Sequence, residues 1–202
     1  MIEKTQSDPD NFRIDMFYYH RARDAMFDAV SLLKEKGYET VFIPGYIGWS
    51  PKEGSGIFDP INRIKGLKRC YYRMTEDLEI DLDALKGSLM PRSILLTVNY
   101  FGFRDKRIRL VMELARQRDC VVVEDNAHGL FTYFCHGSVQ ADITFFSLHK
   151  MFPFPEGGGL LIPNKTLCLA PERNLKERTF PDPFVYDLNG IAEKRKENFR
   201  AL

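Results

Sequence analysis

Two apolar segments of this chain end in side chains that could carry acid–base and carbonyl chemistry. The segment VVVEDNAH places Asp125 directly after a run of valines, and the segment SLHK places Lys150 shortly after the apolar run ITFF. The carboxylate and the amine are 25 residues apart in the sequence. A lysine amine can condense with an aldehyde, and a carboxylate can keep a ring nitrogen protonated. These are two of the features that pyridoxal phosphate requires of a protein, and the third is a set of hydroxyl and backbone N–H groups that holds its phosphate.

Short apolar runs bounded by Gly, Pro or polar residues predict the strands that would position these side chains. The runs are apolar along their whole length, which is typical of strands that are buried on both faces. We expect strands at 40–43, about 68–72, 93–98, 120–123, 143–146 and 160–162.

Helices are predicted between these strands where apolar residues recur at intervals of three and four. The clearest is 21–36, which ends at Gly37. We further expect a helix capped by Asp81 that runs to Leu89, one capped by Asp105 that runs to Arg118, a short helix near 60–65, and a helix over 191–202.

Alternation of helices with buried strands predicts an α/β fold, a three-layer sandwich around a mostly parallel mixed sheet. Ligands of such sheets bind beyond the carboxyl ends of the strands. We therefore expect Asp125 and Lys150 to meet at one edge of the sheet.

The composition excludes several other classes of protein. A formal net charge of +1 gives no electrostatic reason to expect nucleic acid or a membrane surface as a partner. The four cysteines are widely spaced, which predicts free, mostly buried thiols and neither a metal site nor disulfides. The polar N-terminus and the absence of a long apolar run lead us to expect a cytoplasmic protein.

Three segments in order, VVVEDNAHG, DITFFSLHK and EGGGLLI, resemble the fold-type-I pyridoxal-phosphate enzymes, and most closely the DegT/DnrJ/StrS family of sugar aminotransferases. That family carries an E-D-x-A-[QH] motif, a serine before a histidine and lysine, and a Gly-Gly strand. The upstream segments TVFIPGYIGWS, YYRMTEDLEIDLDALKGSL and LLTVNYFGF also resemble it. The likeness covers the chain from about residue 17 to 202. Three local features depart from the pattern. The spacer before the lysine is two residues shorter, Asn99 stands where a histidine is common, and Ala22–Arg23 stands where the family has a Gly-Thr style phosphate turn.

The resemblance implies a role for each candidate residue of the site. Lys150 would hold pyridoxal 5'-phosphate and act with Asp125 as a catalytic residue, Asp125 pairing with the ring nitrogen. The resemblance further implies that His128 lies near the ring hydroxyl, that Ser147 and the backbone of Ala22 and Arg23 bind the phosphate, and that Trp49, with Tyr46 as the second choice, stacks on the ring.

The resemblance also implies a domain organisation and partners. We expect an N-terminal arm over 1–16, a cofactor-binding large domain over 17–190, and over 191–202 the start of a helix that leads to a small C-terminal domain missing from this chain. The implied reaction transfers an amino group from an amino-acid donor to a keto-sugar nucleotide. The fold type implies a homodimer whose subunits complete each other's phosphate pockets, and the aromatic Phe17, Tyr18 and Tyr19 cluster and the Trp49 loop are consistent with an interface.

Other interpretations of these residues stay open at this point. Lys150 could be a solvated lysine, Asp125 and Ser147 could cap turns, His128 could be structural, and Trp49 could serve packing alone. The chain could also be a truncated, non-catalytic binding or interaction module that retains the fold. A nucleotide-binding doubly wound domain is disfavoured because neither GxGxxG nor a P-loop follows any strand.

Overall fold

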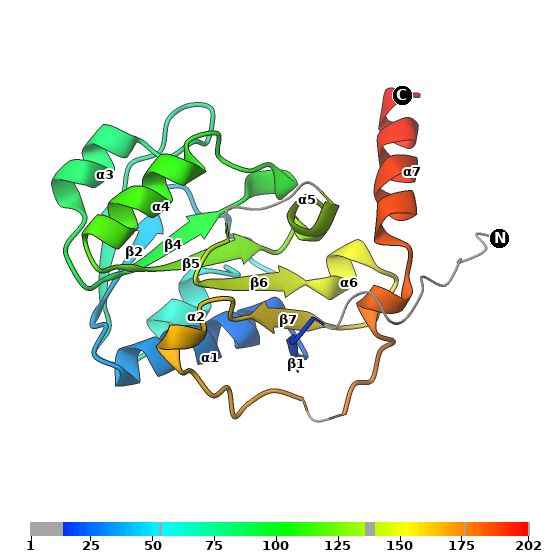
Figure 1. The fold of residues 1–202 in the computed structure, drawn as a ribbon, viewed down its shortest axis with the longest axis horizontal. Coiled ribbons are helices and arrows are strands. Elements are labelled where there is room, and N and C mark those ends of the chain that lie inside the picture. The colour runs from blue at the N-terminus through cyan, green and yellow to red at the C-terminus, as the bar shows by residue number, and fades with distance from the viewer. Residues whose placement is uncertain (1–13, 53, 136–139, 176, 202) are drawn as a thin grey trace.

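Seven strands form one mixed sheet in the order β1-β7-β6-β5-β4-β2-β3 (Figure 1). The computed structural model describes residues 14–52, 54–135, 140–175 and 177–201. Most of the expected N-terminal arm, residues 1–13, lies outside the described residues. The strands are β1 (Phe17–Tyr19), β2 (Thr40–Pro44), β3 (Lys68–Tyr72), β4 (Ile94–Val98), β5 (Val121–Asn126), β6 (Ile143–Ser147) and β7 (Gly158–Leu161).

Strands β3, β2, β4, β5 and β6 are parallel. At the β6 edge the sheet continues with β7, which is antiparallel to β6, and with β1, which is antiparallel to β7. Parallel strands bring their carboxyl ends to the same edge of the sheet, so Val98, Asp125 and Phe145 lie side by side. The predicted mostly parallel mixed sheet is confirmed.

Helices cover both faces of the sheet, which gives the three predicted layers (Figure 1). On one face, α1 (Ala22–Glu35) and α2 (Phe58–Asn62) pack on strand residues such as Val41 and Val123. On the other face, α3 (Leu82–Ser88) and α4 (Ile108–Gln117) pack on Phe42, Leu95 and Val122. Alternate residues of β5 therefore point into different layers.

A third, strongly aromatic cluster lies beside the β6–β7 end of the sheet. It includes Phe146, Phe152 and Phe154 and is bordered by α5 (Leu130–Cys135), α6 (Leu148–Met151) and α7 (Leu188–Arg200). Three short 3-10 turns complete the elements, η1 (Tyr100–Gly102), η2 (Lys165–Leu167) and η3 (Pro183–Val185). Much of the unusual aromatic content therefore fills this part of the core.

Several expectations need correction. Asp105 does not cap α4, whose N-cap is Arg107; the Asp105 carboxylate accepts from the backbone N–H groups of Ile80 and Arg107 instead. Asp125 lies within β5 and not after it, and Lys150 lies on α6 one turn beyond β6. All four thiols are free, as expected, but only Cys120 is buried.

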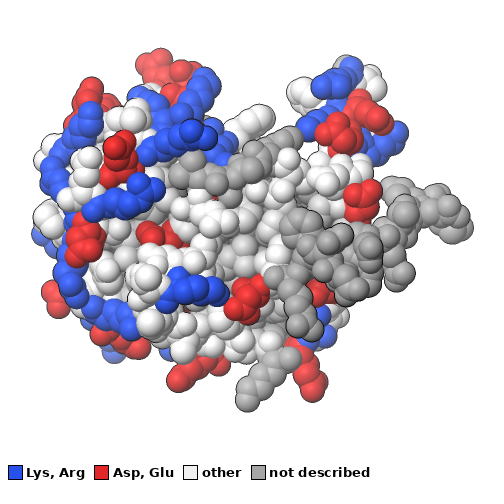
Figure 2. Space-filling model, viewed as in Figure 1, with Lys and Arg blue, Asp and Glu red and all other residues white. Residues whose placement is uncertain are grey.

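The distribution of charge on the surface and the length and polarity of the helices complete the description of the fold. On the face shown in Figure 2, basic and acidic side chains are interspersed over the described residues. Within the part of the chain that the structure describes, every helix is too short or too polar to cross a bilayer.

Candidate functional site

A cavity of about 880 Å³ opens at the carboxyl ends of β4, β5 and β6, beside the start of α1. This is the size range of pockets that hold cofactors and small ligands. All the residues predicted to bind a cofactor line it except Trp49; they are Ala22, Arg23, Asp125, His128, Ser147 and Lys150.

Lys150 and His128 meet inside this cavity. The Lys150 Nζ atom lies 3.0 Å from the His128 Nε2 atom, with α6 carrying the lysine and the turn after β5 carrying the histidine. Burial lowers the pKa of His128, and the neighbouring charge of Lys150 lowers it further. A neutral imidazole at pH 7 can accept a hydrogen bond from the lysine ammonium group.

Asp125 is a buried carboxylate on the cavity side of the sheet. Its side chain is hydrogen-bonded at 2.8 Å by the backbone N–H of Ala127. Burial raises the pKa of Asp125 to about 6, and the charge of Glu124 adds to this rise, whereas the Ala127 N–H and Lys150 oppose it. A carboxyl group with a pKa this close to neutrality, in a cavity, is typical of a functional site.

Ser147 ends β6 and is buried, as its predicted role at the cavity wall requires. Its Oγ atom lies 3.3 Å from the Nδ1 atom of His149, a residue that also lines the cavity. The sequence analysis assigned no role to His149. Its position directly before Lys150 was the signal that could have identified it.

The start of α1 forms another wall of the cavity. Arg21 is the N-cap and makes no side-chain cap hydrogen bond, and Ala22 and Arg23 follow it along the cavity. A Cβ on Gly158 would lie 2.7 Å from the Ala22 nitrogen, so a glycine is needed where β7 passes this helix end. The N-terminus of a 14-residue helix favours an anion.

The aromatic residues near the cavity differ from the expectation. Trp49 is 68% exposed and lies outside the lining, whereas Tyr46 lines the cavity. The Tyr46 ring packs edge-on against Tyr100, with ring centroids 5.6 Å apart, and the Tyr100 hydroxyl donates to the Tyr46 carbonyl at 2.5 Å. Tyr100 and Phe101 also line the cavity and were not predicted from the sequence, although both follow the end of β4, where ligand-binding residues are expected.

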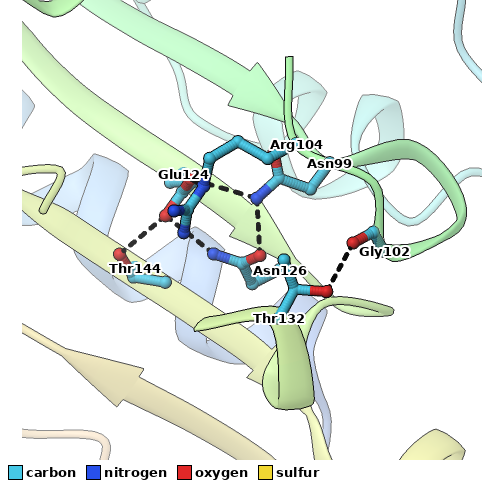
Figure 3. A network of polar contacts seen from close by, with 7 residues as sticks. All are labelled: Asn99, Gly102, Arg104, Glu124, Asn126, Thr132 and Thr144. Atoms are coloured by element: carbon cyan, nitrogen blue, oxygen red, sulfur yellow. Dashed lines mark hydrogen bonds and ion pairs between the residues drawn. The ribbon is translucent and has the colours of Figure 1, made fainter. Parts of the chain in front are cut away.

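Asn99, which stands where the family commonly has histidine, also lines the cavity. Its side-chain amide is directed into the sheet, because Nδ2 donates to Glu124 at 3.0 Å and to Asn126 at 2.6 Å (Figure 3). Asn99 therefore connects the cavity wall to a polar network on the other side of the sheet.

The comparisons with known proteins agree with this architecture. No protein-family model matches the chain, and no curated protein matches it in sequence. Among solved structures, an aminotransferase from Psychrobacter cryohalolentis has a TM-score of 0.60 at 16% identity, over 92% of this chain and 52% of its own. The sugar aminotransferase CalS13 from Micromonospora echinospora has a TM-score of 0.55 at 20% identity, over 75% and 42% of the two chains.

A third similar structure is NtdA from Bacillus subtilis, solved with bound cofactor PMP, with a TM-score of 0.58 at 18% identity, over 75% of this chain and 34% of NtdA. The chain thus spans between 34% and 52% of the length of these three structures. At these identities the likeness shows the fold, which is that of the fold-type-I pyridoxal-phosphate enzymes.

Proposed function

We propose that this chain is the cofactor-binding unit of a pyridoxal-phosphate aminotransferase of the DegT/DnrJ/StrS type. One observation carries the proposal: Lys150, Asp125 and the start of α1 line the same cavity. These features supply the amine, the carboxylate and the anion site that pyridoxal phosphate requires, and they come from three separate segments of the chain. The sugar aminotransferases among the similar structures support the choice of reaction.

The residues present fit this cofactor. Lys150 would hold it through Nζ, Asp125 would face its ring nitrogen, and His128, adjacent to Nζ, would lie near the ring hydroxyl. Ser147 and the backbone N–H groups of Ala22 and Arg23 would hold the phosphate. The glycine at position 158 keeps this helix end clear of any β7 side chain.

When bound, the cofactor supplies an electron-withdrawing ring, and the chain's own residues then direct protons. The Lys150 amine would carry a proton at Nζ between the reacting carbon atoms. A neutral His128 beside it can accept a hydrogen bond and orient that amine. Asp125, ionised above about pH 6, holds the proton on the ring nitrogen.

The charges around the cavity support an anionic acceptor substrate. Basic side chains outnumber acidic ones on the described lining, where Arg21, Arg23, Lys52 and Lys150 lie with Asp125 and Glu156, and they still do so when Lys150 is assigned to the cofactor. One phosphate at the start of α1 does not account for all of these cations. A keto-sugar nucleotide, which adds a diphosphate, fits this excess, and an amino acid would serve as the donor.

We further propose that the chain forms a homodimer through the cavity face. Trp49, Phe101 and Phe103 are large apolar side chains that are 68 to 77% exposed. Phe101 lines the cavity, and Phe103 and Trp49 lie close to lining residues in the sequence. Exposed aromatic residues in one region are typical of an interface core. Trp49 would then act at the interface and not by stacking on the ring of its own subunit.

Two measurements test the proposed function in sequence. Purified protein mixed with pyridoxal phosphate should develop a visible absorbance band that hydroxylamine removes. In a separate sample that retains the band, glutamate should convert it to the band of the amine form of the cofactor. A protein that shows neither change would contradict the proposal. Binding without any response to amino donors would favour the non-catalytic binding module.

A further inference from the structure

Glu124 is an ionisable residue buried in the middle of the sheet. Its side chain is 1% exposed, and it shares a strand face with Val122, which packs under α4. It therefore points away from the cavity that its neighbour Asp125 lines. A buried carboxylate costs several kcal/mol unless donors satisfy it, so its presence here needs a physical reason.

Donors from neighbouring strands and a following loop surround this carboxylate (Figure 3). One oxygen accepts from Asn99 at 3.0 Å and lies 3.9 Å from the Arg104 guanidinium group. The other accepts from Asn126 at 2.7 Å and from Thr144 at 3.4 Å. Burial raises the pKa of Glu124, and each of these four contacts opposes the rise. The carboxylate thus links the residue after β4, the end of β5 and the second residue of β6.

Two of these partners begin the turns that form the cavity wall. Asn99 precedes the turn at 100–102, where Phe101 has a positive φ of 56°. Asn126 precedes the turn at 127–129, and its Oδ1 atom accepts from Asn99 and occupies the space that a Cβ on Gly129 would need. The two amide side chains are fixed to each other and to Glu124.

The two turns also pack against each other. A Cβ on Gly102 would lie 2.5 Å from the His128 carbonyl oxygen, and the Thr132 hydroxyl donates to the Gly102 carbonyl at 2.7 Å (Figure 3). A shift of either turn must therefore move His128. His128, whose Nε2 atom lies 3.0 Å from Lys150 Nζ, is thus held by its backbone against the turn at 100–102.

We propose that Glu124 is a positioning residue, which holds His128 beside Lys150 through Asn99, Asn126 and the two turns that they begin. An ionised carboxylate offers only acceptors, so both asparagines can direct their NH₂ groups toward it. A glutamine at this position would present an NH₂ group to one of them and break part of the network. The importance of Lys150 rests on the proposed function, but the position of His128 does not.

The test is a Glu124→Gln variant followed by NMR titration of the histidine side chains in the protein without cofactor. The chain has four histidines, and a His128→Asn variant assigns the signal of interest. In the wild type the pKa of His128 lies below its ordinary value. We expect E124Q to raise it toward that value, because an imidazole that leaves this position loses part of the burial that lowers its pKa and also moves away from the Lys150 charge. The rate at which pyridoxal phosphate attaches should fall by about tenfold or more.

Three further variants make the result decisive. The double variant E124Q/N126D exchanges the amide and the carboxylate within the network, and it should restore both the titration and the rate. Asn99→Ala removes one link without adding a new polar group, and it should shift the titration in the same direction by less. Glu79→Gln is the matched control, because Glu79 loses the same charge but pairs with Lys106 and Arg107 away from the cavity.

A lower melting temperature in E124Q with an unchanged His128 titration would show that Glu124 is only structural and would overturn the proposal. If E124Q does not fold, an unchanged titration in N99A would overturn it as well. A wild type that never reacts with pyridoxal phosphate would contradict the proposed function alone, since the titration requires no cofactor.

Discussion

The floor and the rim of the cavity are built in opposite ways. At the floor, Asp125, Ser147 and Asn99 are buried, and each has a hydrogen-bonding partner fixed by neighbouring strands or turns. At the rim, Tyr46 and Phe101 are 51% and 70% exposed and come from loops. The sheet fixes Asp125 and Ser147 before any ligand arrives, whereas Lys150 is exposed on α6 and the rim leaves apolar surface for a second partner to cover.

The largest effect that would sharpen this contrast is expected at Asp125. Asp125→Asn keeps the shape of the floor but cannot hold a proton on the ring nitrogen, so amine transfer should fall by about 100-fold or more. The rate of the first half-reaction with glutamate checks this expectation. Unimpaired transfer in D125N would count against the role assigned to the carboxylate.

The same variant should become more stable at neutral pH. Burial raises the pKa of Asp125 from 3.8 to about 6, so the folded state disfavours the charged form. This cost is absent below about pH 4, grows as the pH rises, and is complete above about pH 6, where it amounts to about 3 kcal/mol. The free energy of unfolding of D125N should exceed that of the wild type at pH 7 and match it at pH 4. A less stable D125N at pH 7 would contradict a desolvated carboxylate.

Two glycines provide a smaller test, which compares the rigid wall at the start of α1 with the rim. Gly158→Ala places a methyl group against the backbone of Arg21 and Ala22, so the free energy of unfolding should fall by about 3 kcal/mol and phosphate affinity should weaken. Gly56→Ala is the rim control, because Gly56 lines the cavity and has open space around it, whereas Gly158 lies against the backbone of α1. Its effect should stay within about 0.5 kcal/mol in denaturant unfolding. Equal losses in the two variants would remove the distinction.

Substitutions at the rim should have the smallest effects on the stability of one subunit. Their effect should appear in the oligomeric state. Light scattering should report a dimer at micromolar concentration, and a Trp49→Ser, Phe103→Ser double variant should shift it toward the monomer. Both side chains are exposed, so the melting temperature of the isolated subunit should change little. A monomeric wild type in the presence of cofactor would show that the rim is no interface.

The sequence predicted the floor better than the rim, for physical reasons. Strand ends are marked by a change from apolar to polar residues, which placed Asp125, Ser147 and Lys150 within a turn of their positions. The loop around Trp49 has no periodicity, so nothing in it indicates which aromatic side chain points inward. The strand predicted at 120–123 is observed at 121–126, because the backbones of β4 and β6 pair with residues 124–126, and the local sequence does not reveal these neighbours.

The central claim is that Lys150 is the residue that holds pyridoxal phosphate. The most direct measurement is reduction of the mixture of protein and cofactor with borohydride, followed by mass spectrometric mapping of the modified peptide. We expect a single cofactor per chain on Lys150, and a Lys150→Ala variant that keeps its fold but gains neither the adduct nor the visible absorbance. Modification of a different lysine, or an unchanged adduct in K150A, would contradict it.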